Sequence, residues 1–128
     1  MSNESRQTVT LKSGDHLSYI TSGSGPALVM LPGWSQSAEG WRKQIDEFAQ
    51  DHTVYALDLR GHGESSNASG GYRIARLATD VHEFLEQLNL TEVSLMGHSM
   101  GCSVIWAYLE HYGTDRISRL ILVDQAPM

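Results

Sequence analysis

The chain has 128 residues, of which 41% are hydrophobic and 19% are charged, so we expect one globular domain with a modest core and not a disordered chain. Its net charge of -6 argues against a nucleic-acid binder, which needs a basic surface. No apolar run is long enough to cross a membrane, no secretory signal is visible at the start, and the single cysteine fits a reducing compartment, so we expect a cytoplasmic protein.

Apolar or alternating runs predict six strands, and stretches with apolar residues every three or four positions predict three helices. The first two strands flank the turn Gly14-Asp15, which predicts an antiparallel hairpin. The later runs are apolar throughout, which is typical of strands buried on both faces. The predicted strands span 8–14, 16–23, 27–31, 54–59, 93–96 and 120–123, and the predicted helices span 41–49, 74–88 and 100–112.

The order of these elements is a hairpin followed by strands that alternate with helices. This order predicts an α/β fold with a mainly parallel sheet in three layers, because the crossovers place helices on the faces of the sheet. No repeat or linker divides residues 1–128, so we expect a single domain. We interpret the acidic residues of the second helix, Asp80, Glu83 and Glu86, as a face in contact with water.

The strongest chemical signal is the run Gly97-His98-Ser99-Met100-Gly101, which lies between a predicted strand and a predicted helix. In this context G-x-S-x-G predicts a sharp turn that presents the Ser99 hydroxyl as a nucleophile. The residues that flank such a turn must be small, and Gly97 and Gly101 satisfy this requirement. The N–H of Met100, at the helix N-terminus, is predicted to stabilise the oxyanion of a tetrahedral intermediate.

A second oxyanion donor is predicted in the loop that follows the strand 27–31. The N–H of Trp34 is the candidate, because Gly33 lets the backbone approach closely. The alternative is that this segment is only a turn and that the Trp34 side chain has a packing role, with no part in an oxyanion hole. Trp34, Met100 and Ser35 are the predicted pocket walls, which indicate an apolar acyl site.

Four segments together resemble the α/β-hydrolase fold superfamily: PGW after the strand 27–31, DLRGHGES from Asp58, the GHSMG turn and the closing LILVDQAP. The resemblance covers the chain as the N-terminal half of that fold and is greatest to esterases, cofactor-free haloperoxidases and C–C hydrolases. It implies a serine hydrolase that acts on a small ester or related acyl compound without a cofactor or metal. Serine at the turn argues against epoxide or haloalkane chemistry, which uses a carboxylate nucleophile in this fold. His62 is expected to make hydrogen bonds within its loop.

The family order of catalytic residues is serine, acid, histidine. Asp124, after the last strand, is the candidate acid, and the alternative is a polar residue that lines or supports the site. Among residues 100–128 the histidine is His111, about three turns into its helix and expected to point away. His98 resembles the elbow histidine of the family, which is not the base. No residue of the sequence matches the catalytic histidine.

The cap and C-terminal strands that the resemblance implies are also absent from the sequence. We therefore expect a fold that stops after its sixth strand: either the N-terminal portion of a longer enzyme or a half-fold that self-associates through the exposed edge of 120–123. A non-catalytic binding or interaction module is the alternative to an enzyme.

The expected partner is a small acyl molecule, and no nucleic acid, membrane or metal partner is expected. Cys102 is interpreted as a small core residue.

Overall fold

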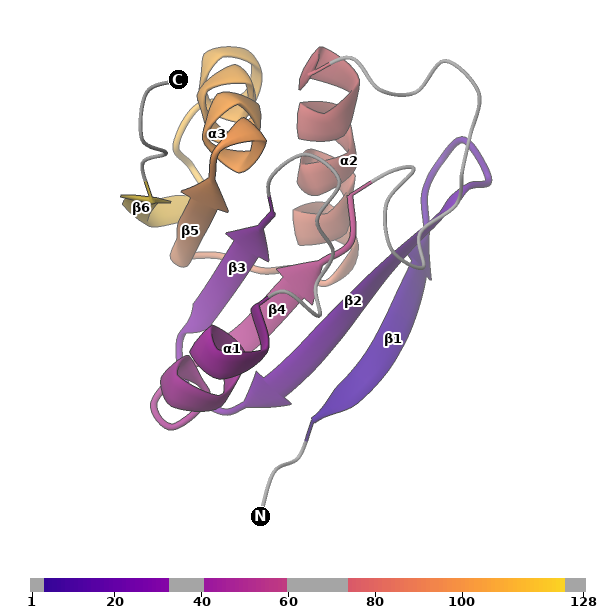
Figure 1. The fold of residues 1–128 in the computed structure, drawn as a ribbon. Helices are drawn as coiled ribbons and strands as arrows, with labels where there is room; N and C mark the ends of the chain where they lie inside the picture. The colour runs from indigo at the N-terminus through magenta and orange to yellow at the C-terminus, as the bar shows by residue number, and fades with distance from the viewer. Residues whose placement is uncertain (1–3, 33–40, 60–73, 124–128) are drawn as a thin grey trace.

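The computed structural model describes residues 4–32, 41–59 and 74–123, whose strands form one sheet in the order β1-β2-β4-β3-β5-β6 (Figure 1). β1 pairs with β2, and β2 with β4, in antiparallel fashion, whereas the β4–β3, β3–β5 and β5–β6 pairs are parallel. The predicted mainly parallel sheet with an N-terminal hairpin is therefore confirmed. The strands are β1 Ser5–Thr10, β2 His16–Gly23, β3 Ala27–Leu31, β4 Thr53–Leu57, β5 Val93–His98 and β6 Ile117–Val123, and the helices are α1 Arg42–Phe48, α2 Ile74–Gln87 and α3 Met100–Tyr112.

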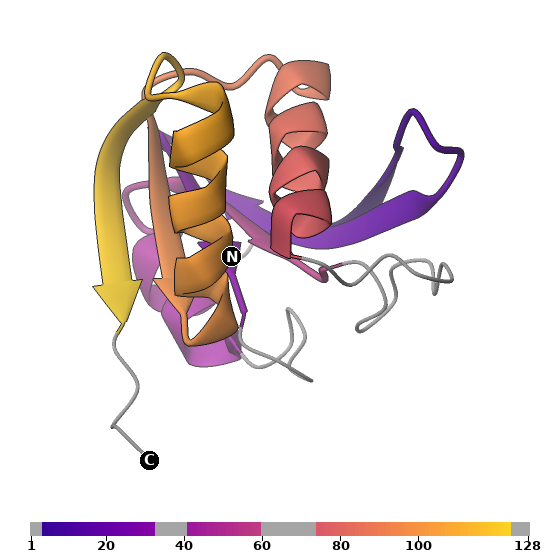
Figure 2. The ribbon, with the colours of Figure 1, turned by 90° about the horizontal axis from the view of Figure 1, so that it is seen from above.

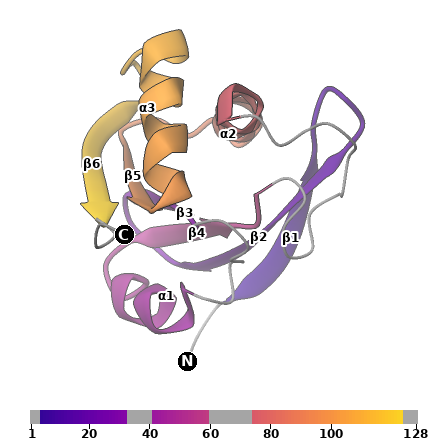
Figure 3. The ribbon, with the colours of Figure 1, turned by 45° about the horizontal axis from the view of Figure 1, so that its top comes forward.

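The helices cover the sheet from both sides: α1 lies on one face, and α2 and α3 lie on the other (Figure 3). The unbroken apolar run of β3 fits a strand whose two faces are both covered by helices. Val29 and Leu31 join the core beneath α2 and α3, whereas Leu28 and Met30 join the core beneath α1. Because successive side chains of a strand point to opposite faces, each residue of the run finds an apolar layer.

Helix α3 begins at Met100 and ends at Tyr112, as the sequence predicts. Gly113 ends it with a φ of 75°, a left-handed conformation that glycine adopts without strain, and its N–H donates to the carbonyl of Leu109 at 2.9 Å. The helix buries Val104, Ile105 and Tyr108 against the sheet and α2.

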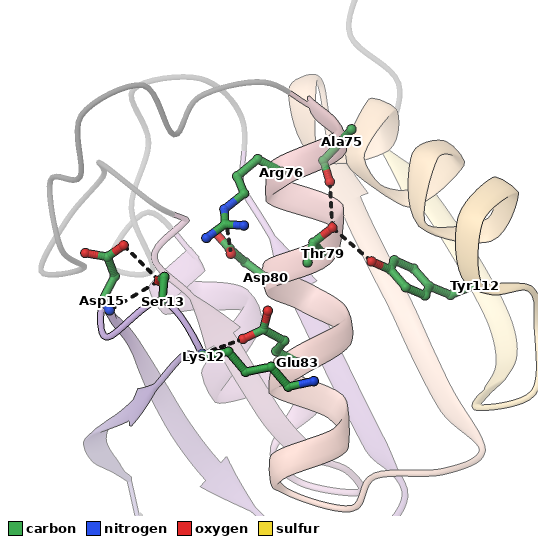
Figure 4. Close-up of polar contacts among 9 residues, drawn as sticks. All are labelled: Lys12, Ser13, Asp15, Ala75, Arg76, Thr79, Asp80, Glu83 and Tyr112. Atoms are coloured by element: carbon green, nitrogen blue, oxygen red, sulfur yellow. Dashed lines mark hydrogen bonds and ion pairs between the residues drawn. The ribbon is translucent and has the colours of Figure 1, made fainter.

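The acidic side chains of α2 do not form the expected water-facing surface. Asp80 is fully buried and Glu83 is 7% exposed, and only Glu86 of the three is exposed. The Glu83 carboxylate accepts the backbone N–H of Lys12 at 2.8 Å, and Asp80 lies 3.8 Å from the guanidinium of Arg76 (Figure 4). The prediction was wrong because the partner of Glu83 comes from the distant β1–β2 connection.

Several strand boundaries also differ from the predicted ones. β1 is Ser5–Thr10 where 8–14 was predicted, and β5 runs to His98, two residues past its predicted end. β6 begins at Ile117, and so includes the polar residues Ser118 and Arg119, and a register irregularity interrupts its pairing with β5 at Val93 and Ser94. β4 ends at Leu57, two residues before the predicted end. β6 can carry polar residues because it lies at the edge of the sheet formed by the described residues, where its side chains are exposed or half-buried.

A buried ion pair ties the N-terminal hairpin to the end of β4. The Asp58 carboxylate is fully buried and lies 2.8 Å from Nη1 of Arg6, which also donates to Oγ of Ser18 at 2.7 Å. The N–H of Asp58 donates to the carbonyl of Ser18 at 2.9 Å. Because a charge taken out of water is costly unless it is paired, this contact fixes where the chain leaves β4.

Removal of the Arg6 guanidinium should therefore destabilise the fold. We expect Arg6→Met to lower the free energy of unfolding by about 2 kcal/mol, because it removes the guanidinium that lies 2.8 Å from the buried Asp58 carboxylate. Arg42→Met is the matched control, since its ion pair with Glu4 is partly exposed and worth about 1 kcal/mol or less. Urea unfolding of both variants measures the difference, and equal losses would contradict a special role for the Arg6–Asp58 pair.

Candidate functional site

The site predicted from the sequence lies at the carboxyl ends of β3 and β5. These strands are parallel neighbours, with Leu31 opposite Gly97, so the chain leaves both at the same edge of the sheet. Adjacent strands are about 5 Å apart, which brings Pro32 beside His98. The loop that begins after Pro32 therefore starts next to the turn that carries Ser99.

Ser99 joins β5 to α3 in an unusual backbone conformation. Its φ is 56° and its ψ is -114°, and the residue is half-buried. A side chain at positive φ costs about 1–3 kcal/mol and persists only where the surrounding structure holds it. One such support is the Ser99 carbonyl, which accepts the N–H of Cys102 at 2.9 Å.

The first residue of α3 supplies a donor beside this serine. The N–H of Met100 lies in the first turn, where a helix has no carbonyl of its own to accept it. The same end of the helix carries the positive end of the helix dipole. Both properties favour a negatively charged oxygen near Ser99.

Two glycines allow the turn to pack closely on its neighbours. A Cβ on Gly101 would collide with the carbonyl oxygen of Leu31 and would lie 3.1 Å from that of Pro32. A Cβ on Gly97 would lie 2.7 Å from the carbonyl carbon of Gly101 and 2.8 Å from Cδ1 of Ile105. The absence of side chains at these positions lets α3 rest directly on the end of β3.

His98 points to the opposite face of the sheet from α3. Its ring packs edge to face against Trp41, with 6.3 Å between centroids and 87° between planes. Trp41 is 8% exposed and belongs to the core beneath α1, and its buried Nε1 has no hydrogen-bond partner among the described residues. The sequence predicts Trp41 only as part of a helical stripe, so its contact with the elbow histidine was missed.

Cys102 makes more specific contacts than those of a simple core residue. It is half-buried, and its Sγ lies 3.3 Å from the carbonyl oxygen of Gly97 and 3.8 Å from that of Val123. The thiol therefore connects the ends of β5 and β6.

Other residues named from the sequence lie outside the described part of the chain. These are Gly33, Trp34, Ser35, His62 and Asp124, so their roles stay predictions. His111 is described: it is exposed, in the last turn of α3, with its ring beside Tyr112. The structure thus brings together the turn from Gly97 to Gly101 and the end of β3.

Within residues 4–32, 41–59 and 74–123, no three His, Cys, Asp or Glu side chains are grouped so as to hold a metal ion. No helix in the same ranges is long and apolar enough to span a membrane.

Comparison with known proteins matches residues 26–128 to the alpha/beta hydrolase fold family. The chain is 38% identical over 127 residues to a soluble epoxide hydrolase of Corynebacterium sp. (strain C12), a match that covers 99% of this chain and 44% of that protein. It is 30% identical to a non-heme chloroperoxidase of Kitasatospora aureofaciens, over 92% of this chain and 43% of the relative. An esterase structure from Exiguobacterium antarcticum superposes with a TM-score of 0.89 at 31% identity, over 95% of this chain and 46% of that one. The chain therefore spans less than half the length of these relatives.

The backbone strain at Ser99 can be measured by replacing the serine with glycine and comparing the free energies of unfolding. We expect Ser99→Gly to raise the free energy of unfolding by about 1 kcal/mol, because glycine adopts a positive φ readily and this gain exceeds its entropic cost. Ser103→Gly, at an exposed position of the same helix, should instead lower the stability by about 0.5 kcal/mol. Chemical denaturation of both variants tests the opposite signs, and a loss in both would argue against strain.

The close approach of α3 to β3 predicts a second effect. Gly101→Ala should lower the stability by about 2–3 kcal/mol, because the new methyl group meets the backbone of Leu31 and not a side chain that can rotate away. Ser103→Ala is the control and should change the stability by less than about 0.5 kcal/mol. Thermal and urea unfolding provide the measurement, and an unaltered Gly101→Ala protein would show that the turn is not tightly packed.

Proposed function

The chain belongs to the α/β-hydrolase fold family, and on this premise we propose that the protein is a serine hydrolase of small esters or related acyl compounds. The observation that carries the proposal is the conformation of Ser99, held at positive φ between the end of β5 and the N-terminus of α3. Such a position lifts the hydroxyl clear of the strand and places it beside a helix N-terminus.

In the proposed reaction, Oγ of Ser99 attacks the carbonyl carbon of the substrate while a base takes its proton. The carbonyl oxygen becomes an oxyanion, which accepts hydrogen bonds from the N–H groups of Met100 and Trp34. Departure of the alcohol leaves an acyl-serine, and water then releases the acid. Trp34 lies outside the described residues and enters from its place in the sequence.

The identity of the nucleophile separates this proposal from epoxide opening. The Corynebacterium relative is named an epoxide hydrolase, but this chain has serine at position 99. Attack of a serine on an epoxide carbon would give an ether, which water does not cleave readily. Attack on an acyl carbon gives an ester, which water can hydrolyse, so a serine at this position supports acyl transfer.

The base is the part of the mechanism for which this chain offers no clear residue. The sequence from Met100 to Met128 contains one histidine, His111. Its side chain is exposed in the last turn of α3, far from Ser99 along the helix. Asp124 stays the candidate acid. We propose that the general base belongs to polypeptide beyond these 128 residues, consistent with relatives more than twice as long. Loss of a triad histidine lowers the rate by about 10⁶ and leaves about 10³–10⁴ over the uncatalysed reaction.

The setting of the reaction is also a proposal. A single thiol, half-buried and hydrogen-bonded, needs no oxidising environment, so we place the protein in a reducing compartment such as the cytoplasm. A non-catalytic binding module with the same fold is the alternative function.

Two measurements on the 128-residue chain test the proposal. We expect almost no turnover of an activated acetate ester above the Ser99→Ala control, because the base is missing. We also expect slow modification by a fluorophosphonate, with the adduct found by mass spectrometry on Ser99 and not on the exposed Ser103, because the turn and its donor remain.

The outcomes separate the competing functions. Rapid turnover that disappears in Ser99→Ala would contradict the missing base and would point to His62. Modification spread evenly over the surface serines would contradict a nucleophilic Ser99 and favour a binding module.

A further inference from the structure

His98 connects the turn that carries Ser99 to the helix α1. It is the last residue of β5 and directly precedes Ser99. Its ring packs edge to face against Trp41, the residue that precedes α1, with 6.3 Å between the ring centroids. A side chain more than fifty positions away in sequence thus contacts the neighbour of the proposed nucleophile.

The His98 side chain and α3 lie on opposite faces of the sheet. A Cβ on Gly97 would meet Ile105 of α3, so the side chain of the next residue points to the face that α1 covers. α1 and α3 lie on opposite sides of β5 (Figure 2). The turn is therefore contacted from both faces, by α3 on one and by Trp41, through His98, on the other.

Trp41 is held in place by the core beneath α1. It is 8% exposed and belongs to the same buried cluster as Ile45 and Met96. Met96 lies two residues before His98 in β5, so both side chains stand on the same face of the sheet. The indole is thus fixed against the strand that leads to Ser99.

Tryptophan is an unfavourable residue for the position that it occupies. Trp41 is the N-cap of α1 and makes no side-chain capping hydrogen bond, whereas Ser, Thr, Asp or Asn would accept a helix N–H there. Its buried Nε1 has no hydrogen-bond partner among the described residues, which is a second cost. Departures from such local rules are expected where a function requires them. The contact of the indole with His98 offers a reason for tryptophan at this position.

We propose that Trp41 is a positioning residue for Ser99 and acts through the ring of His98. The positive φ of Ser99 persists only while its surroundings hold it. On the α3 side, the N–H of Cys102 donates to the Ser99 carbonyl, and on the α1 side the packed His98 ring gives the support. Without the indole, His98 can turn, the backbone at Ser99 can relax, and the hydroxyl and the N–H of Met100 lose their alignment. The inference rests on the proposed role of Ser99 as the nucleophile.

The rate at which a fluorophosphonate labels Ser99 in the 128-residue chain tests the proposal. We expect Trp41→Leu to lower this rate about tenfold or more, because small displacements of a reacting group have large effects on rate. Trp41→Phe keeps an aromatic ring beside His98 and should retain most of the rate. His98→Ala should lower the rate as Trp41→Leu does, and the double variant should be no slower than either single variant, because both remove the same contact.

Val54→Ala is the matched control for loss of packing. Val54 is fully buried in the same core, and its pairing with Leu28 places it at the end of the sheet away from Ser99. We expect this variant to unfold at lower urea concentration without slower labelling. Circular dichroism checks that each variant is folded, and His98→Ala, at a half-buried position, tests the contact even if Trp41→Leu does not fold.

Unfolding gives a second readout that does not depend on the reactivity of Ser99. Ser99→Gly should raise the urea midpoint, because glycine adopts the positive φ readily. In the Trp41→Leu background we expect this rise to shrink to about half or less, because the backbone has already relaxed. In the Val54→Ala background the rise should be unchanged.

The outcomes separate this inference from the proposed function. Selective labelling of Ser99 that Trp41→Leu and Val54→Ala slow equally would overturn the positioning role and leave the serine hydrolase in place. Labelling without preference for Ser99 in the unaltered chain would overturn the proposed function, and the Ser99→Gly comparison would then decide whether Trp41 supports the turn. A full rise from Ser99→Gly in the Trp41→Leu background would show that it does not.

Discussion

The close contact between the start of α3 and the end of β3 is the constraint on which the rest of the site depends. A Cβ on Gly101 would collide with the carbonyl oxygen of Leu31, so the helix can approach the strand this closely only with glycine at this position. Ser99 joins β5 to this helix at a positive φ, a conformation that persists only where the surrounding packing holds it. The strain is a local cost of packing, and the apolar layers on both faces of the sheet compensate for it.

Much of the fold could be predicted from local pattern. The run 27–31 coincides with β3, and residues 100–112 coincide with α3, because an unbroken apolar run and a glycine stop are properties of short segments. The partners of Arg6 and Glu83 could not be predicted, since each contact joins residues more than fifty positions apart in sequence. Helical spacing shows which residues share a face, but it does not show whether a neighbour will cover that face.

The candidate site divides in the same way. The turn around Ser99 is encoded within five residues and was predicted from them, whereas the contact of Trp41 with His98 depends on the distant helix α1. Trp34 and Asp124 stay predictions, because they lie outside the described residues. The base could not be assigned from sequence, because its position in this fold is set by chain topology and not by a local motif.

The strand order also constrains how the chain can fold as it is synthesised. β4 lies between β2 and β3, so the N-terminal hairpin has no place in the sheet until about thirty more residues have been made and the β3–α1–β4 crossover has formed. Until then the inner edge of β2, with Tyr19 and Ile20, has no partner strand. β1 and β2 are thus synthesised before β3 and β4 but join the sheet only after them, and in the meantime they depend on hairpin pairing alone, which is marginally stable in water.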